Sequence, residues 1–127
     1  MTKYLIDTHI LIFYFTDKSK LTKWQLETID SLNTEIYVST ITFFEMATLL
    51  RLKKIDVGMS ISEFYYMQQS HGFKELDYGI IEIEMLSKII PIKDHKDPVD
   101  LLLLCQLATN KIDIITNDRN INLYNKT

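Results

Sequence analysis

The sequence predicts an α/β domain in which helices cover both faces of a short, mostly parallel central sheet. Short apolar runs that end at polar residues alternate along the chain with longer segments of helical character, and this alternation is typical of parallel sheets. The chain has 127 residues, of which 46% are hydrophobic and 24% charged, enough for one self-sufficient core. We therefore expect a single domain over residues 1–127, built as a three-layer α/β/α sandwich around about four to five strands.

Four apolar runs have the length and composition of buried strands. They are Lys3–Ile6, Glu35–Ser39, Phe73–Leu76 and Ile112–Thr116. The last run is rich in isoleucine and stops at Asn117 and Asp118, which are turn-forming residues. Each run is therefore expected to cross the core once and to end at a polar edge.

Six segments have helical character and separate these strands. They are Thr8–Phe15, Leu21–Leu32, Ile41–Lys54, Ser60–His71, Tyr78–Ile90 and the segment that begins at Pro98. Leu21, Trp24, Ile29 and Leu32 give the second of these helices an apolar face, which we expect to be buried. Gly72 follows the fourth helix at the position where a left-handed residue ends many helices.

The segment that ends at Asp118 shows how two distant acids meet. Asp97 precedes Pro98, a pair that predicts an N-cap followed by the first helical residue. Asp100 then falls in the first turn. A helix that precedes a parallel strand runs antiparallel to it, so the start of this helix and the end of the next strand lie at the same edge of the sheet. This geometry brings Asp100 and Asp118 together.

Two further acids are expected at the same edge. Asp7 directly follows the first strand, and Glu45 lies about one turn into the helix after the second strand. Ligands of open α/β sheets bind at the carboxyl ends of the strands. Two ionised carboxylates about 4 Å apart repel by roughly 4 kcal/mol at an effective dielectric of 20. Convergence of these acids therefore predicts a bound cation, and oxygen ligands suit Mg²⁺ or Mn²⁺ better than Zn²⁺.

Each acid taken alone also has a simpler interpretation. Asp7 and Asp118 would serve as turn residues or helix caps. Asp97 and Asp100 resemble a capping box, which fully explains Asp97 but only half explains Asp100. Glu45 has the weakest alternative, because a buried apolar helix face has no need of a charge. The convergence of the acids is what favours a metal site over these separate explanations.

Composition and charge limit the classes of function. The net charge of −3 argues against a broad electrostatic grip on nucleic acid, but metal ions can supply positive charge locally in a nuclease. Cys105 is the only cysteine, which fits a reducing cytoplasmic location. The apolar stretch at the start of the chain is too short and interrupted for a membrane span and lacks a cleavage-like site. We therefore expect no membrane association.

Four segments, in this order and spacing, resemble PIN-domain ribonucleases and most closely the VapC toxins of bacterial type II toxin–antitoxin pairs. The segments are YLIDTHILI, FEMATLL, HKDPVDLLLLCQLA and IITNDRNI. The resemblance covers nearly the whole chain and implies a PIN-like fold and a Mg²⁺-dependent endoribonuclease. It also implies an RNA substrate, a cognate antitoxin and a homodimer. The catalytic and metal-binding acids that it implies are Asp7, Glu45, Asp100 and Asp118.

The neighbours of these acids receive supporting roles. Thr8, Thr116 and Asn117 would shape the site by hydrogen bonding, and Asp97 would act mainly as the helix N-cap. Candidates for contacts with substrate phosphates are Arg51, Lys96 and Arg119. Leu101 stands where the family often has arginine, which alters a contact beside the site. The chain ends soon after Asp118, so we expect only a stub of the further edge strand that relatives usually have.

The function predicted from these features is hydrolysis of RNA phosphodiester bonds by metal-activated water. A non-catalytic PIN-like module that binds a protein partner is the alternative, although all four acids are present. A phospho-receiver domain fits less well, because it needs a lysine after its last strand. We also expect an antitoxin to cover exposed aromatic side chains of the early helices. These side chains are Phe13, Phe15, Phe64, Tyr65 and Tyr66.

Overall fold

One parallel sheet forms the centre of the protein. The structure is a computed structural model that describes residues 1–90 and 97–118. Its sheet has the strand order β3-β2-β1-β4, and every neighbouring pair is parallel. The strands are β1 (Thr2–Ile6), β2 (Thr34–Ser39), β3 (Lys74–Leu76) and β4 (Asp113–Ile115). The predicted α/β class with a parallel sheet is therefore confirmed.

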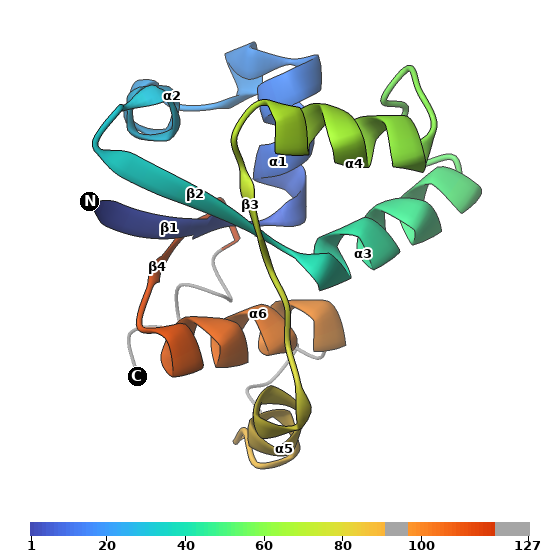
Figure 1. Cartoon of the computed structure of the whole chain (residues 1–127). Helices are drawn as coiled ribbons and strands as arrows, with labels where there is room; N and C mark the ends of the chain where they lie inside the picture. The colour runs from blue at the N-terminus through green and yellow to red at the C-terminus, as the bar shows by residue number, and fades with distance from the viewer. Residues whose placement is uncertain (91–96, 119–127) are drawn as a thin grey trace.

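Helices cover both faces of this sheet, as Figure 1 shows. The α-helices are α1 (Thr8–Thr16), α2 (Lys23–Asp30), α3 (Thr40–Arg51), α4 (Ile61–Ser70), α5 (Ile80–Ser87) and α6 (Pro98–Asn110). A short 3₁₀ helix, η1 (Lys18–Lys20), was not predicted. Gly72 follows α4 with a φ of 109°, as expected for a residue that ends a helix. The chain thus alternates strands and helices in the predicted order.

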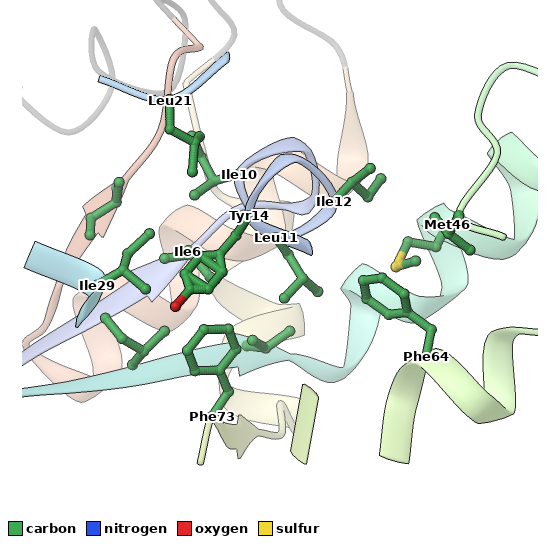
Figure 2. Close-up of a cluster of buried hydrophobic side chains, with 14 residues drawn as sticks. Ile6, Ile10, Leu11, Ile12, Tyr14, Leu21, Ile29, Met46, Phe64 and Phe73 are labelled. Atoms are coloured by element: carbon green, nitrogen blue, oxygen red, sulfur yellow. The ribbon is translucent and has the colours of Figure 1, made fainter. Parts of the chain in front are cut away.

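Alternating side chains of the strands divide the core into two parts. Ile6 of β1 faces α1, α2 and α4, where it joins a large cluster of buried apolar residues. Its neighbour Leu5 faces the other way and packs against Leu103 and Leu107 of α6. Figure 2 shows the larger cluster, with Met46 and Phe64 packed beside the α1 side chains. This two-sided burial is the three-layer arrangement predicted from the alternation of elements.

The predicted apolar face of the second helix is wrong in two positions. The helix ends at Asp30, so Leu32 lies beyond it and is 91% exposed. Trp24 is 56% exposed and forms a T-shaped contact with the Tyr4 ring, with 6.1 Å between the centroids. Gln25 and Ile29 are the buried residues of α2. The buried side of α2 therefore runs through Gln25 and Ile29, four positions apart, and Trp24 lies next to that side.

The aromatic docking surface expected for a partner is also wrong in most of its members. Phe64 is fully buried, and Phe13, Phe15 and Tyr65 are half-buried. Phe15 and Phe64 meet edge to face, with 5.6 Å between their ring centroids, which is a favourable aromatic geometry in a core. Only Tyr66, at 64% exposure, remains on the surface. These aromatics mainly join α1 to α4.

The most exposed apolar helix lies on the other side of the molecule. α5 packs against α6 below the sheet (Figure 1). Ile80 is 75% exposed and Ile81 is 66% exposed, and no residue of α5 is buried. Within residues 1–90 and 97–118, none of the helices is long and apolar enough to cross a membrane.

The strand order places a crevice beside the first strand. From β1 the chain builds outward through β2 to β3, and it then returns to add β4 on the opposite side of β1. Such a reversal opens a crevice at the carboxyl ends of the two strands on either side of it, which is where ligands of open α/β sheets bind. Asp7 lies at this point, and its N–H donates to the Ile115 carbonyl at 3.3 Å.

Candidate active site

Asp7 is held rigidly at the end of β1. It is the N-cap of α1, and its Oδ1 accepts a hydrogen bond from the Ile10 N–H at 3.0 Å. Its Oδ2 accepts a second bond from the Thr116 hydroxyl. Burial raises the pKa of Asp7 above its ordinary value, and the hydrogen bonds from Thr116 and Ile10 oppose part of that rise. The cap interpretation is therefore correct for Asp7, and the same residue also faces the crevice.

Thr116 connects the acids that follow β1 and β4. Its hydroxyl donates to Asp7 and accepts from the Asp118 N–H at 2.9 Å. One side chain therefore sets the position of two acids that are far apart in sequence. A hydroxyl with one donor and two acceptor sites suits this bridging position.

Asn117 is positioned by a residue that the sequence analysis missed. The Gln25 Nε2 donates to the Asn117 Oδ1 at 2.8 Å. Gln25 is 5% exposed and also completes a capping box with Thr22 at the start of α2. The T-x-x-Q spacing is a readable signal for the start of a helix. Nothing in that spacing indicates the contact with Asn117.

Glu45 enters the crevice from α3. It is half-buried, and burial is the main cause that raises its pKa. A hydrogen bond from the Thr8 side chain acts in the opposite direction, and the charge of Asp97 raises the pKa further. Thr8 is 1% exposed, and its hydroxyl lies 3.4 Å from that of Thr42. A buried hydroxyl pair thus anchors Glu45 between α1 and α3.

Asp97 and Asp100 meet Glu45 at the start of α6. Asp97 is the N-cap, and its Oδ1 accepts from the Val99 N–H at 2.9 Å. One carboxylate oxygen from each of Glu45, Asp97 and Asp100 lies within 4.8 Å of the other two. Asp100 shares a side-chain hydrogen bond with Asp118. Asp100 therefore faces the crevice, which the capping-box interpretation does not explain.

Asp100 is an acid of this group with a strongly raised pKa. Burial raises its pKa to about 8, and the charges of Asp97 and Asp118 add to the rise. Its hydrogen bond with Asp118 and the charge of Glu45 act in the same direction. Acids that crowd one another in this way retain a proton unless a cation compensates their charge.

The acids surround a hollow of about 340 Å³. It is lined by Asp7, Thr8, His9, Ile10, Phe13, Glu45, Asp97, Asp100, Asn117 and Asp118. His9 is exposed, and its charge lowers the pKa of both Asp7 and Glu45. The His9 ring lies 6.1 Å from that of Phe13, between centroids. The lining of the hollow therefore combines carboxylates with the rings of His9 and Phe13.

The candidate phosphate contacts lie elsewhere or outside the described residues. Arg51 is the last residue of α3, six positions after Glu45, and it does not line the hollow. Lys96 and Arg119 lie outside the described residues. Leu101, at the position where the resemblance expects arginine, is half-buried on α6.

The donor set of the hollow fits a hard divalent cation. The acidic side chains of the hollow offer carboxylate oxygens. Mg²⁺ and Mn²⁺ prefer such oxygen ligands. Oxygens bound to an octahedral Mg²⁺ are about 3–4 Å apart, given bonds of about 2.1 Å. The observed limit of 4.8 Å for Glu45, Asp97 and Asp100 is only slightly wider. Small side-chain rotations would bring these oxygens to one ion.

Comparisons with known proteins agree with this architecture. Residues 4–126 match the family described as the PIN domain. Among solved structures, a similar chain belongs to VapBC2 from Rickettsia felis bound to a DNA fragment from their promoter. The alignment covers 97% of this chain and 93% of that chain, with a TM-score of 0.59 and 17% sequence identity, a likeness of fold. No curated protein sequence matches. Since the family match spans almost the entire sequence, this chain belongs to the PIN domain family.

Proposed function

We propose that this protein is a divalent-metal-dependent endoribonuclease and the toxin of a type II toxin–antitoxin pair. The observation that carries the proposal is the meeting of acids from four separate segments in one hollow. Asp7 follows β1, Glu45 lies on α3, Asp100 starts α6 and Asp118 follows β4. These four residues are the proposed catalytic and metal-binding acids, with Mg²⁺ or Mn²⁺ as the cofactor.

The surroundings of the acids support the binding of a cation that compensates their negative charge. A bound divalent cation would act as a Lewis acid for hydrolysis of a phosphodiester bond. The chain supplies the fixed geometry: Asp7 is held by hydrogen bonds from Ile10 and Thr116, and Asn117 is held by Gln25. Without a cation, Asp100 holds a proton near neutral pH, because its pKa is raised to about 8.

The rim of the hollow supports a nucleic acid substrate. His9 and Phe13 place two rings beside the acids, and base–aromatic stacking is a common and sequence-tolerant contact with single strands. Arg51, Lys96 and Arg119 are proposed as candidates for phosphate contacts because of their positive charge. Because the net charge is −3, the protein as a whole does not attract RNA. Bound metal ions would supply positive charge at the site.

A protein partner would cover part of the apolar surface. The similar solved structure is a VapBC2 complex, and we propose a cognate antitoxin and a homodimer for this protein. Ile80 and Ile81 on α5 are mostly exposed, and clustered apolar side chains on a surface commonly mark contacts with other proteins. The antitoxin would place a basic side chain among the acids and compensate their charge in place of metal.

The decisive experiment is an RNA cleavage assay with controlled metal. The purified protein should cut RNA in Mg²⁺ or Mn²⁺ and stop cutting in excess EDTA. Asp7→Asn should remove cleavage while the protein stays folded. Full cleavage in excess chelator would overturn the metal mechanism. Binding of the antitoxin without any cleavage under all metal conditions would favour the non-catalytic module instead.

A further inference from the structure

We infer that Asp97 has two roles: it caps α6, and it also binds the divalent cation together with Glu45 and Asp100. This inference rests on the proposed function. It differs from the sequence expectation, in which Asp97 acts mainly through the helix and four other acids hold the metal. The structure places Asp97 in the wall of the acidic hollow, in the same group of close carboxylates as Glu45 and Asp100.

The cap bond leaves Asp97 free to take a second role. The Asp97 Oδ1 accepts from the Val99 N–H at 2.9 Å, and an ionised carboxylate has about four acceptor sites on its two oxygens. The side chain is exposed, so a cation with part of its water shell can reach it. One acceptor site of Asp97 can therefore serve the cap while another binds a cation.

The Asp97 carboxylate also crowds two other acids, because one oxygen each of Glu45 and Asp100 lies within 4.8 Å of it. An N-cap has no need of this charge, because Asn and Ser cap helices as well as Asp does. A cation between the three carboxylates would turn their mutual repulsion into attraction. The geometry therefore suits a ligand better than it suits a cap alone.

Two other helices have complete capping boxes, which differ from the start of α6. Thr22 of α2 and Ser60 of α4 each form a capping box, in which Gln25 and Glu63 bond back to the cap residue. Asp100 holds the equivalent position in α6, but its side chain bonds with Asp118. Both acids of the D-x-x-D segment thus contribute to the hollow.

Calorimetric titration with Mn²⁺ tests this inference without relying on activity. Asp97→Asn preserves the cap and removes the charge, so the metal-free protein should melt at the same temperature as the parent or higher. Its affinity for Mn²⁺ should fall at least about tenfold, the scale on which groups around a metal affect binding. Asp97→Ala should lose the same affinity and also melt earlier without metal, because the cap is lost.

Asp17 provides a matched control. It caps η1 through a bond from the Ser19 N–H at 3.2 Å and lies outside the hollow. Asp17→Asn should bind Mn²⁺ like the parent. If Asp97→Asn also binds like the parent while Asp100→Asn does not, Asp97 is a cap only and the proposed function stands. If the parent itself binds no Mn²⁺, both this inference and the metal-dependent function are overturned.

Discussion

Aspartates at the two ends of the sheet have opposite surroundings. At the amino ends of the strands, Asp30 accepts a hydrogen bond from the Tyr14 hydroxyl, and the same hydroxyl lies 3.1 Å from the His71 Nε2. At the carboxyl ends, Asp100 meets Asp118, whose charge raises its pKa. Asp30 accepts a hydrogen bond from a tyrosine hydroxyl, whereas Asp100 lies among other acids.

The amino end has a hollow too, but its acids have partners of other kinds. A space of about 480 Å³ is lined there by residues that include Asp30, Glu35 and His71. Glu35 accepts from the Tyr37 hydroxyl at 2.8 Å and pairs with Lys74 at 3.4 Å. Each acid at this end is therefore satisfied by the protein itself.

The difference shows which property identifies the candidate site. Both ends contain a hollow and acidic side chains, so neither feature separates them. Within residues 1–90 and 97–118, a group of three close carboxylates is found at the carboxyl end alone. Such an arrangement is unfavourable without an added cation. Unfavourable local electrostatics held in place by a rigid fold are typical of functional sites.

The largest expected effect comes from comparing two substitutions, one of an acid at each end of the sheet. Asp100→Asn should abolish RNA cleavage, because it removes a proposed metal ligand, and it should leave the metal-free protein at least as stable as the parent. Asp30→Asn should keep cleavage and lower the melting temperature, because its bond with Tyr14 is weakened. Cleavage rates and melts of the two variants measure this contrast. Normal cleavage by Asp100→Asn would show that Asp100 is not a catalytic residue.

Thr116→Val should reduce cleavage and Mn²⁺ affinity by about 10–100-fold, the usual effect of removing a group that orients metal ligands. The hydroxyl bonds with both Asp7 and Asp118, so its loss would free two acids at once. Thr116→Ser should restore most of the activity. Thr109→Val is the control, because the Thr109 hydroxyl bonds only within α6. Equal losses in both valine variants would mean a general effect on folding.

The pH dependence of stability should differ between the parent and Asp100→Asn. Folding raises the pKa of Asp100 from 3.8 to about 8, so the folded protein retains a proton that the unfolded chain has lost between these pH values. The contribution of Asp100 to the free energy of unfolding is therefore fully present below about pH 4, falls as the pH rises, and is lost above about pH 8. For this half-exposed group, solvent screening reduces the loss to the order of 2 kcal/mol.

Urea unfolding in EDTA at several pH values would measure that slope. Asp100→Asn should flatten it, since the variant has no proton to lose at this position. Saturating Mg²⁺ should stabilise the parent most at the higher pH values, where the acids are ionised. An unchanged slope in the variant would assign the titration to another group.

Tyr14→Phe should have the smallest effect of the four changes. It removes the hydroxyl that joins Asp30 to His71 and should cost about 1 kcal/mol, the usual worth of a buried hydrogen bond. Cleavage should stay normal, because the ring remains packed against Phe73. Tyr65→Phe is the comparison, since its bond to Glu75 is exposed and its loss should be milder. A strong loss of cleavage in folded Tyr14→Phe would show that the two ends of the sheet are coupled.

The sequence by itself determined the order of the elements and the edge at which the acids gather. Apolar runs, the Asp97–Pro98 pair and Gly72 are local signals, and local signals act through backbone geometry and short-range hydrogen bonds. From them followed the parallel sheet and the proximity of Asp100 to Asp118. The structure adds distances and partners to these predictions.

Only the tertiary structure decided which side chains face the core and which face the hollow. Trp24 is exposed and Phe64 is buried, although both belong to helices that were correctly predicted. Gln25 reaches Asn117 across 92 residues of sequence, and Asp97 approaches Glu45 from another helix. Such contacts depend on how a helix is rotated against its neighbours. That rotation is set by packing between distant segments, and no local pattern in the sequence encodes it.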